Sequence, residues 1–319
     1  MIEPGGEVRV SSTSARRPFA PGARRGLFTA AQLTGIALVA PALIVVFGVL
    51  VYPVLYNVII SIQAQSWVAP PEERGAWVGL ANYSKLLGSN LFGDAWLTTG
   101  RFVLVAIAVQ YLLGLGMALV MSSGMRGVSF VRTAFLTPMM LAPVVVGIEW
   151  RWLLSGNFGV VRYALRAVGF DPPIWLSDPT WALYALVVAD AWQHAPFIAL
   201  ILLATLQSIP LEIYEAARVD GASGLRMFRS ITFPLITSAS LIAVLIRFGD
   251  LLKAFDLVYV MTAGGPGKTT EVVSLYTFWL GFSQGELGQA AAAANIVALV
   301  AMAAGGVLVV LIRTHTRIV

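Results

Sequence analysis

The chain has 319 residues and a net charge of +5, and 58% of its residues are hydrophobic while only 12% are charged. Soluble domains carry about 25% charged residues, so a globule of this composition would lack the polar surface that water requires, and much of the chain must face lipid. The absence of cysteine excludes a disulfide framework and cysteine-based catalysis or metal binding, and the two histidines, His194 and His315, lack metal-ligand spacing.

The N-terminal segment, residues 1–30, is rich in Ser, Pro, Gly and Arg and is predicted to form a mobile basic tail. An apolar run over about 33–62 follows it. A cleavable export signal has an apolar core of only about 7–15 residues before its cleavage site, so the length of this run favours a first transmembrane helix over a signal peptide. Together with the polar loop behind it, this helix makes residues 31–97 the next predicted section of the chain.

Six apolar segments are long enough to cross a bilayer, since a helix needs roughly 20 residues to span a hydrocarbon core about 30 Å thick. They lie at about 33–62, 98–122, 133–154, 181–207, 234–262 and 287–312. Prolines interrupt several of them and are expected to bend the helices. The sequence therefore predicts an all-α integral membrane protein with six transmembrane helices. Residues 98–312 are its predicted core transmembrane domain, and 313–319 a short tail.

Basic residues in the connections predict the orientation. Five arginines precede the first span, and seven more lie in the 2–3 connection, the 4–5 connection and the C-terminal tail, against six basic residues on the opposite side. Cytosolic loops of membrane proteins are enriched in lysine and arginine. Both termini and the 4–5 connection are therefore predicted to be cytosolic.

The 4–5 connection, residues 209–234, is predicted to form two short helices. Pro210 can open the first, with Glu215 near the positive end of its dipole. Gly221 permits a break between the two helices, and Phe228 belongs to an apolar face of the second. A short amphipathic helix pair at this position is suited to docking onto a partner.

This connection resembles the coupling loop of binding-protein-dependent ABC importer permeases, which has Glu-Ala-Ala, three residues, Gly, nine variable residues and an Ile-x-Leu-Pro-like end. Here Glu215-Ala216-Ala217 is followed by Gly221, and Ile231-Thr232-Phe233-Pro234 closes the segment, with Phe233 in place of the usual leucine. The Asp-Gly-Ala sequence that begins at Asp220 is also typical of this coupling loop. The resemblance extends over about residues 30–312.

The resemblance implies an ABC importer type I permease fold in a bacterial cell (inner) membrane. The implied partners are a second permease subunit, two ABC ATPase subunits and an extracytoplasmic solute-binding protein. The chain itself would bind no cofactor and catalyse no reaction, because the partner ATPase would use ATP and Mg. The residues expected to contact the ATPase are Glu215, Ala216, Ala217, Asp220, Gly221 and Phe228.

Three further segments are similar to sugar permeases of the maltose/glycerol-phosphate type: 79–83, 132–138 and 255–267. Six spans with a sizeable first outer loop are similar to the first of the two non-identical permeases in such systems. A carbohydrate is the cargo that these similarities imply. A polyamine, phosphate or peptide importer is an alternative, as is a channel or ion-coupled carrier that uses the charges of the fifth span as its ion path.

Ionisable residues inside membrane spans are costly and often functional. Four of them recur at three-residue steps along the predicted fifth span: Arg247, Asp250, Lys253 and Asp256. In the fourth span, Asp190, Trp192 and Gln193 offer hydrogen bonds and an aromatic face, which suit a sugar. Pairing between helices explains the charges, and packing explains Trp192 and Gln193, as readily as contact with cargo. The candidate cargo path consists of Asp190, Trp192, Gln193, Lys253 and Asp256.

Residues 264–270, Gly-Gly-Pro-Gly-Lys-Thr-Thr, look like a phosphate-binding loop. That motif needs a glycine five residues before its Gly-Lys pair, and position 262 is threonine. The segment also follows a membrane helix rather than a strand. We therefore exclude a nucleotide site here.

Overall fold

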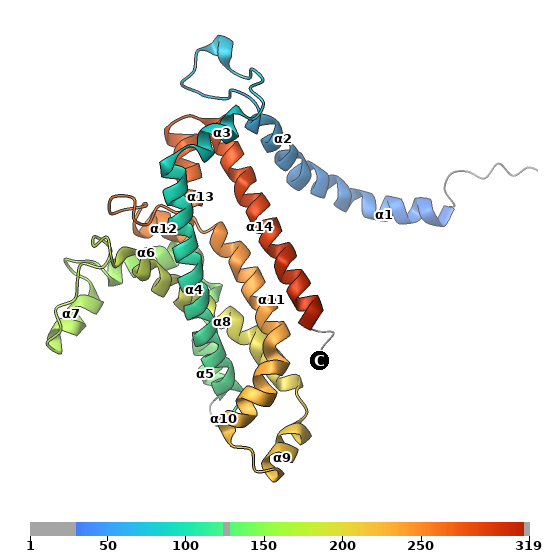
Figure 1. Cartoon of the computed structure of the whole chain (residues 1–319), viewed down its shortest axis with the longest axis vertical. Coiled ribbons are helices and arrows are strands. Elements are labelled where there is room, and N and C mark those ends of the chain that lie inside the picture. The colour runs from blue at the N-terminus through green and yellow to red at the C-terminus, as the bar shows by residue number, and fades with distance from the viewer. Residues whose placement is uncertain (1–29, 124–127, 316–319) are drawn as a thin grey trace, which may run out of the picture. The chain divides into compact units, whose positions relative to one another are not determined.

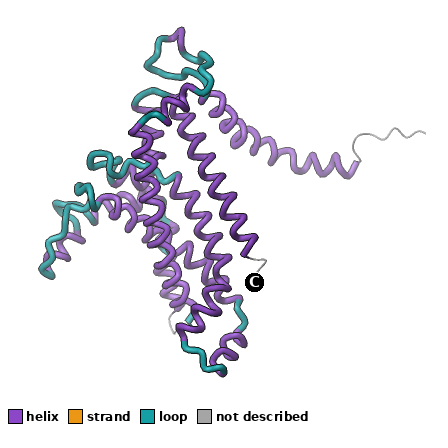
Figure 2. The backbone as a smooth tube through the Cα atoms, viewed as in Figure 1, coloured by secondary structure: helices purple, strands orange, loops and turns teal. Residues whose placement is uncertain are grey.

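The structure, a computed structural model, describes residues 30–123 and 128–315. Within these ranges every regular element is helical, apart from one isolated antiparallel bridge between Gln63 and Trp77 (Figure 2). The predicted all-α fold is confirmed. The predicted basic tail 1–30 lies, but for its last residue, outside the described residues, as do Arg126 and Arg317, two of the cations that predict the orientation.

The chain divides into two compact units, Met1–Val54 and Leu55–Val319. The first unit contains α1 (Ala30–Val46), the π-helical turn η1 (Phe47–Val51) and the beginning of α2 (Tyr52–Ser61). Residues Thr34–Ser61 form one apolar helical stretch long enough to cross a membrane, as predicted for the first span. The division predicted at residue 97 stays a prediction.

Four long helical segments carry the second unit (Figure 1): α4 (Asn90–Ser122), α8 (Ala182–Ser208), α10 with η4 and α11 (Gly224–Leu252), and α14 (Leu287–His315). Each passes the length and hydropathy required of a membrane span. The helix α11 packs against α4, α8 and α14. Phe102 of α4, Leu186 of α8 and Leu251 of α11 are fully buried in one core cluster. The described residues thus hold five straight candidate spans, or six with the bent pair described next.

The third span is sharply bent. It consists of α5 (Val128–Leu136) and the 3-10 turn η3 (Pro138–Met140), followed by α6 (Pro143–Leu153) at an angle of 102°. Pro143 is the first residue of α6, and the residue before a proline is driven into extended backbone, as Ala142 is here. The Gln193 side-chain amide donates to the Leu141 carbonyl at 2.8 Å, so the neighbouring helix α8 satisfies a backbone group that the break exposes.

The predicted fifth span, 234–262, differs from the observed helix at both ends. The helix already begins at Gly224, so the predicted second short helix of the 4–5 connection is the start of this span rather than a separate element. It ends at Leu252, and α12 (Asp256–Met261) is a separate helix. The cause is tertiary: the Phe255 ring stacks on Tyr259 at 5.4 Å and meets Phe278 at 4.9 Å.

Close helix contacts depend on small residues. A Cβ on Gly114 of α4 would lie 2.8 Å from the Ile198 Cβ and 2.9 Å from the Ala195 carbonyl oxygen of α8. Real Cβ atoms do not tolerate such distances, so glycine lets these two long helices pack at their crossing.

Short elements complete the second unit: η2 (Pro71–Glu73), α3 (Ala81–Leu87), α7 (Val160–Ala167), α9 (Leu211–Val219), α13 (Val273–Phe278) and η5 (Trp279–Ser283). Figure 1 shows α9 and α10 at one end and α3 at the other. At the α3 end, the buried Asn82 amide donates to the carbonyls of Ser61 and Gln63. The segment 79–83 therefore fastens the loop that follows the first span.

Candidate functional site

The connection between α8 and α11 is built around α9. Glu212 lies in the first turn of this helix and Arg218 in its last turn, so each charge complements the nearer end of the helix dipole. The Tyr214 hydroxyl lies 3.1 Å from the Thr232 hydroxyl of η4. This contact fixes α9 against the beginning of the fifth span, so the connection is an ordered element.

Gly221 turns the chain between α9 and α10. Its φ is +74°, in the left-handed region that residues with a Cβ reach only at a cost. Its N–H donates to the Arg218 carbonyl at 3.0 Å, and the Ala222 N–H donates to the Ala217 carbonyl at 2.9 Å. A Cβ at this position would meet nothing within 4 Å, so the demand for glycine comes from the backbone conformation alone.

Four of the six predicted coupling residues are exposed on this connection: Glu215, Ala216, Asp220 and Gly221. Ala217 is buried, and Phe228 is half-buried with its ring 6.1 Å from that of Phe233. Ala217 and Phe228 therefore hold the connection together from within. Contact of any of the six with an ATPase stays a prediction.

The structure shows exposed apolar residues at both ends of α9 and beyond the turn. Leu211 is 60% exposed and Val219 is 88% exposed, and Leu225 beyond the turn is 70% exposed. Apolar side chains gathered beside exposed polar ones mark an interaction surface. We define the α9 surface as Leu211, Glu215, Ala216, Val219, Asp220, Gly221 and Leu225.

A buried charge network joins three long helices. Arg247 of α11 donates from Nη2 to Asp190 Oδ2 of α8 at 3.0 Å and from Nε to Gln110 Oε1 of α4 at 2.9 Å. The Gln110 amide also donates to Asp190. His194 Nδ1 lies 3.1 Å from the other carboxylate oxygen of Asp190. The Asp190 and Arg247 side chains are only 6% and 4% exposed, so the central ion pair of the network is buried, while His194 at its edge is 25% exposed.

The four charges predicted to form one stripe do not share a helix. Arg247 and Asp250 lie on α11, 3.5 Å apart, whereas Lys253 follows the end of that helix and Asp256 begins α12. The prediction of a continuous stripe is wrong because the helix breaks at residues 253–255. Lys253 is exposed and reaches back to Asp250 at 3.8 Å.

The predicted cargo-path residues of α8 face different ways. Gln193 is buried, with its amide nitrogen held by the Leu141 carbonyl and its oxygen without a hydrogen-bond partner among the described residues. Trp192 is 40% exposed and meets the ring of Trp150 edge-on at 6.1 Å. Asp190, Trp192, Gln193, Lys253 and Asp256 thus lie in separate surroundings, and their role in a cargo path stays a prediction.

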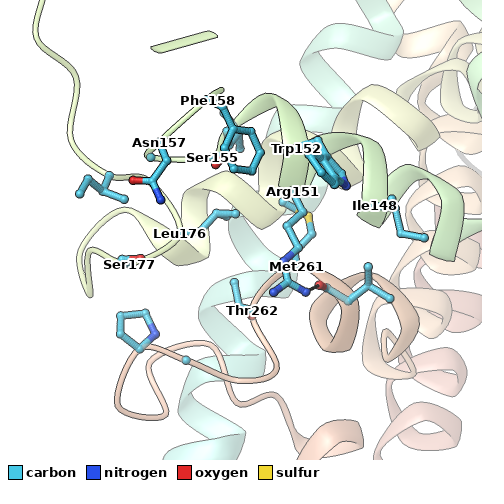
Figure 3. A pocket seen from close by; sticks show the side chains of 16 residues that line it. Ile148, Arg151, Trp152, Ser155, Asn157, Phe158, Leu176, Ser177, Met261 and Thr262 are labelled. Carbon is cyan, nitrogen blue, oxygen red and sulfur yellow. Dashed lines mark hydrogen bonds between the residues drawn. The ribbon is translucent and has the colours of Figure 1, made fainter. Parts of the chain in front are cut away.

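A cavity of about 880 Å³ opens between the C-terminal ends of α6 and α12 and the loops that contain Phe158 and Ser177 (Figure 3). The rings of Trp152 and Phe158 lie 5.0 Å apart on one wall. Arg151, on the same helix as Trp152, donates from Nη1 to the Val260 carbonyl at 3.0 Å. Arg151 thus forms a contact between α6 and α12, and with Trp152 it forms part of a cavity wall.

Next to this cavity, α7 is fastened by charge pairs. The Arg166 Nε donates to Asp171 Oδ1 at 2.7 Å, and Arg162 lies 3.8 Å from the same oxygen. The hydrogen bond from Arg166 and its positive charge hold the pKa of the exposed Asp171 below its ordinary value. This carboxylate is therefore charged at neutral pH, and both pairs are present.

The excluded phosphate-loop segment has a structural explanation for its lysine. Lys268 has a φ of +72° and pairs with Glu271 at 3.8 Å. Burial raises the pKa of Glu271, while the charge of Lys268 acts in the opposite direction. The Gly-Lys pair therefore belongs to a tight loop with an internal ion pair.

Comparison with known proteins adds the family. Residues 110–317 match the family described as binding-protein-dependent transport system inner membrane component. The chain is 34% identical to the trehalose/maltose transport system permease protein MalF of Thermococcus litoralis over 76% of this chain and 82% of that protein. It is 32% identical to the sulfoquinovosyl glycerol transport system permease protein SmoG of Agrobacterium fabrum, over 89% of this chain and 91% of that protein.

The fold is similar to a chain in the crystal structure of a bacterial ABC transporter involved in the import of the acidic polysaccharide alginate. The TM-score is 0.78 at 24% identity, over 89% of this chain and 96% of that chain. The predicted ABC importer permease fold is confirmed.

Proposed function

Because the chain belongs to the family of binding-protein-dependent transport system inner membrane components, we propose that it is a permease subunit of an ATP-driven ABC importer for a carbohydrate. A solute-binding protein on the outer side would deliver the sugar, and the helices of the second unit would line one half of the path across the membrane. The observation that carries the proposal is the likeness, over most of both chains, to permeases named for trehalose/maltose and for sulfoquinovosyl glycerol.

The α9 surface supports the proposal of a separate ATPase. It presents exposed apolar and acidic side chains around small residues, and small residues let a partner approach the backbone closely. We propose that it seats in a cleft of one of two ATPase subunits, which bind the ATP and Mg, while this chain binds no cofactor. Tyr214 and η4 would transmit the motion, because they join α9 directly to the fifth span.

The remaining partners follow from the same proposal. A second, non-identical permease would complete the path, and the bacterial cell (inner) membrane would hold both, with their termini in the cytosol. The charge network of Asp190 and Arg247 favours this reading over an ion-coupled carrier, since its charges satisfy one another and the predicted ion stripe is broken.

Reconstitution tests the function. We expect liposomes with this chain, its second permease and the ATPases to take up maltose or trehalose when the loaded binding protein is present, with ATP hydrolysis stimulated by at least several-fold. The measurement is radiolabelled sugar uptake together with phosphate release. Stimulation by a polyamine, phosphate or peptide instead of any sugar would replace the proposed cargo.

Topology gives a second test. The beginning of α14 contacts the first outer loop, since the Gly288 N–H donates to the Gln65 carbonyl at 2.8 Å, and α14 then spans the membrane away from that loop. We expect a reporter enzyme fused after Val319 to be active only in the cytosol and one inserted at Gly75 to be active only outside. Reporters active on the same side would contradict the six-span arrangement.

A further inference from the structure

The cavity between α6 and α12 has the chemistry of a sugar site. We propose that it is a carbohydrate subsite on the outer side of the permease, where the cargo binds before it reaches the centre of the membrane. This inference rests on the proposed function and adds a site to it. The residues that carry it are Arg151, Trp152, Ser155, Asn157, Phe158 and Ser177.

An aromatic platform forms one wall. Trp152 is 61% exposed and Phe158 is 62% exposed, and their planes meet at 43°. Figure 3 shows the two rings on the same side of the cavity. Exposed rings of this size are costly in water unless something covers them, and the C–H face of a pyranose is a surface that stacks on such rings.

The other walls offer uncharged hydrogen-bonding groups. Ser155, Asn157 and Ser177 line the space, and hydroxyl and amide groups both donate and accept, as sugar hydroxyls do. Binding sites of this kind combine apolar walls with a few convergent polar groups. The cavity volume, about 880 Å³, lies within the range of roughly 300–1,000 Å³ found for ligand sites.

The charge of the cavity wall limits which class of ligand can bind there. Among the described residues that line the cavity, Arg151 is the single charged one. One of its nitrogens is held by the Val260 carbonyl, and a guanidinium has five N–H donors, so others remain for a ligand. A neutral or acidic saccharide suits these walls, whereas a polyamine would find a like charge and no carboxylate.

The position of the cavity fits a site at which the cargo enters the permease from the outer side. Both α5–α6 and α11–α12 start near the end of the unit that carries α9 and run away from it, and the cavity lies where each pair ends (Figure 1). It is also separate from the α8 residues discussed above. Ile148, Arg151 and Trp152 share the cavity face of α6, whereas Trp150 turns to Trp192 on another face.

The test uses the assembled transporter in nanodiscs without its binding protein, titrated with maltose, trehalose and spermidine as probes. Saturation-transfer NMR on the sugar protons measures the apparent Kd. We expect at least one sugar to bind the wild type and Trp152→Ala to weaken it about tenfold, a change equal to about 1.4 kcal/mol. Trp152→Phe is expected to retain most of the affinity. Trp77→Ala is the matched control, because Trp77 is 68% exposed on a loop outside the cavity.

Three results would overturn the subsite. Equal sugar affinity of Trp152→Ala and Trp77→Ala would show that the platform does not bind sugar. Loss of the second permease from purified Trp152→Ala would assign the cavity to a subunit interface. Binding of spermidine but of neither sugar would contradict the charge argument. Sugar uptake by wild-type liposomes is measured in parallel, so that failure of the subsite with normal uptake is distinguished from failure of the proposed function.

Discussion

Gly221→Pro is expected to abolish sugar uptake and binding-protein stimulation of ATP hydrolysis while the permease still inserts and folds. Gly221 has a φ of +74°, whereas proline fixes φ near −65°. Proline also removes the N–H that donates to the Arg218 carbonyl. The turn must then rearrange, and α9 loses its placement against the fifth span. Stimulated ATPase activity of the reconstituted transporter measures the effect, which we expect to reach at least tenfold.

Gly169→Pro is the matched control for this variant. Gly169 also has a positive φ, +86°, an N–H bonded to the carbonyl three residues before it, and open space around its Cβ position. It follows α7, far along the chain from α9. We expect Gly169→Pro to keep ATPase stimulation. Gly221→Ala provides a graded step, since the left-handed conformation costs a residue with a Cβ about 1 kcal/mol. Normal stimulation in Gly221→Pro would show that the α9 surface is not the coupling element.

Arg247→Met is expected to destabilise the permease strongly. The substitution leaves the buried Asp190 carboxylate with only Gln110 and His194 as side-chain partners. Removing one partner of a buried ion pair costs about 3–5 kcal/mol because the remaining charge stays without compensation. Thermal unfolding of the detergent-solubilised protein, followed by fluorescence-detected gel filtration, measures the loss.

Two further variants make this prediction specific. Lys253→Met removes an equally charged residue that is 71% exposed and pairs at 3.8 Å, so we expect a change below about 1 kcal/mol. The double variant Asp190→Leu with Arg247→Met is expected to recover part of the stability, since it leaves no uncompensated ion but removes both partners of the buried Gln110 amide. Equal melting temperatures for Arg247→Met and Lys253→Met would contradict a stabilising role of the network.

Sugar uptake by the stable double variant then separates two roles of Asp190. Its carboxylate is occupied by Gln110, His194 and Arg247. If the network only joins helices, uptake is expected to stay within about twofold of wild type. Loss of uptake in a stable variant would place Asp190 in the cargo path, as its position in the fourth span predicts.

The sequence by itself determined that lipid surrounds much of the chain, that the fold is all-α, and where the coupling segment lies along the chain. Hydropathy is a sum over about 20 neighbouring residues, and a bilayer selects helices by that sum alone. The predicted spans therefore agree with the observed helices to within a few residues over 33–62 and 181–207. The coupling motif is also local, since Glu215 and Gly221 are six residues apart in one connection.

Only the tertiary structure decided which polar residues meet and where the helices break. Gln110, Asp190 and Arg247 lie on three helices, and no spacing along the chain relates them. The chain just beyond the end of α11 packs through Phe255 against the distant Phe278, and the cavity forms where α6 and α12 meet the loops that contain Phe158 and Ser177. These features arise from contacts between residues far apart in sequence, whose free energy enters only when the helices pack, so local composition carries no signal for them.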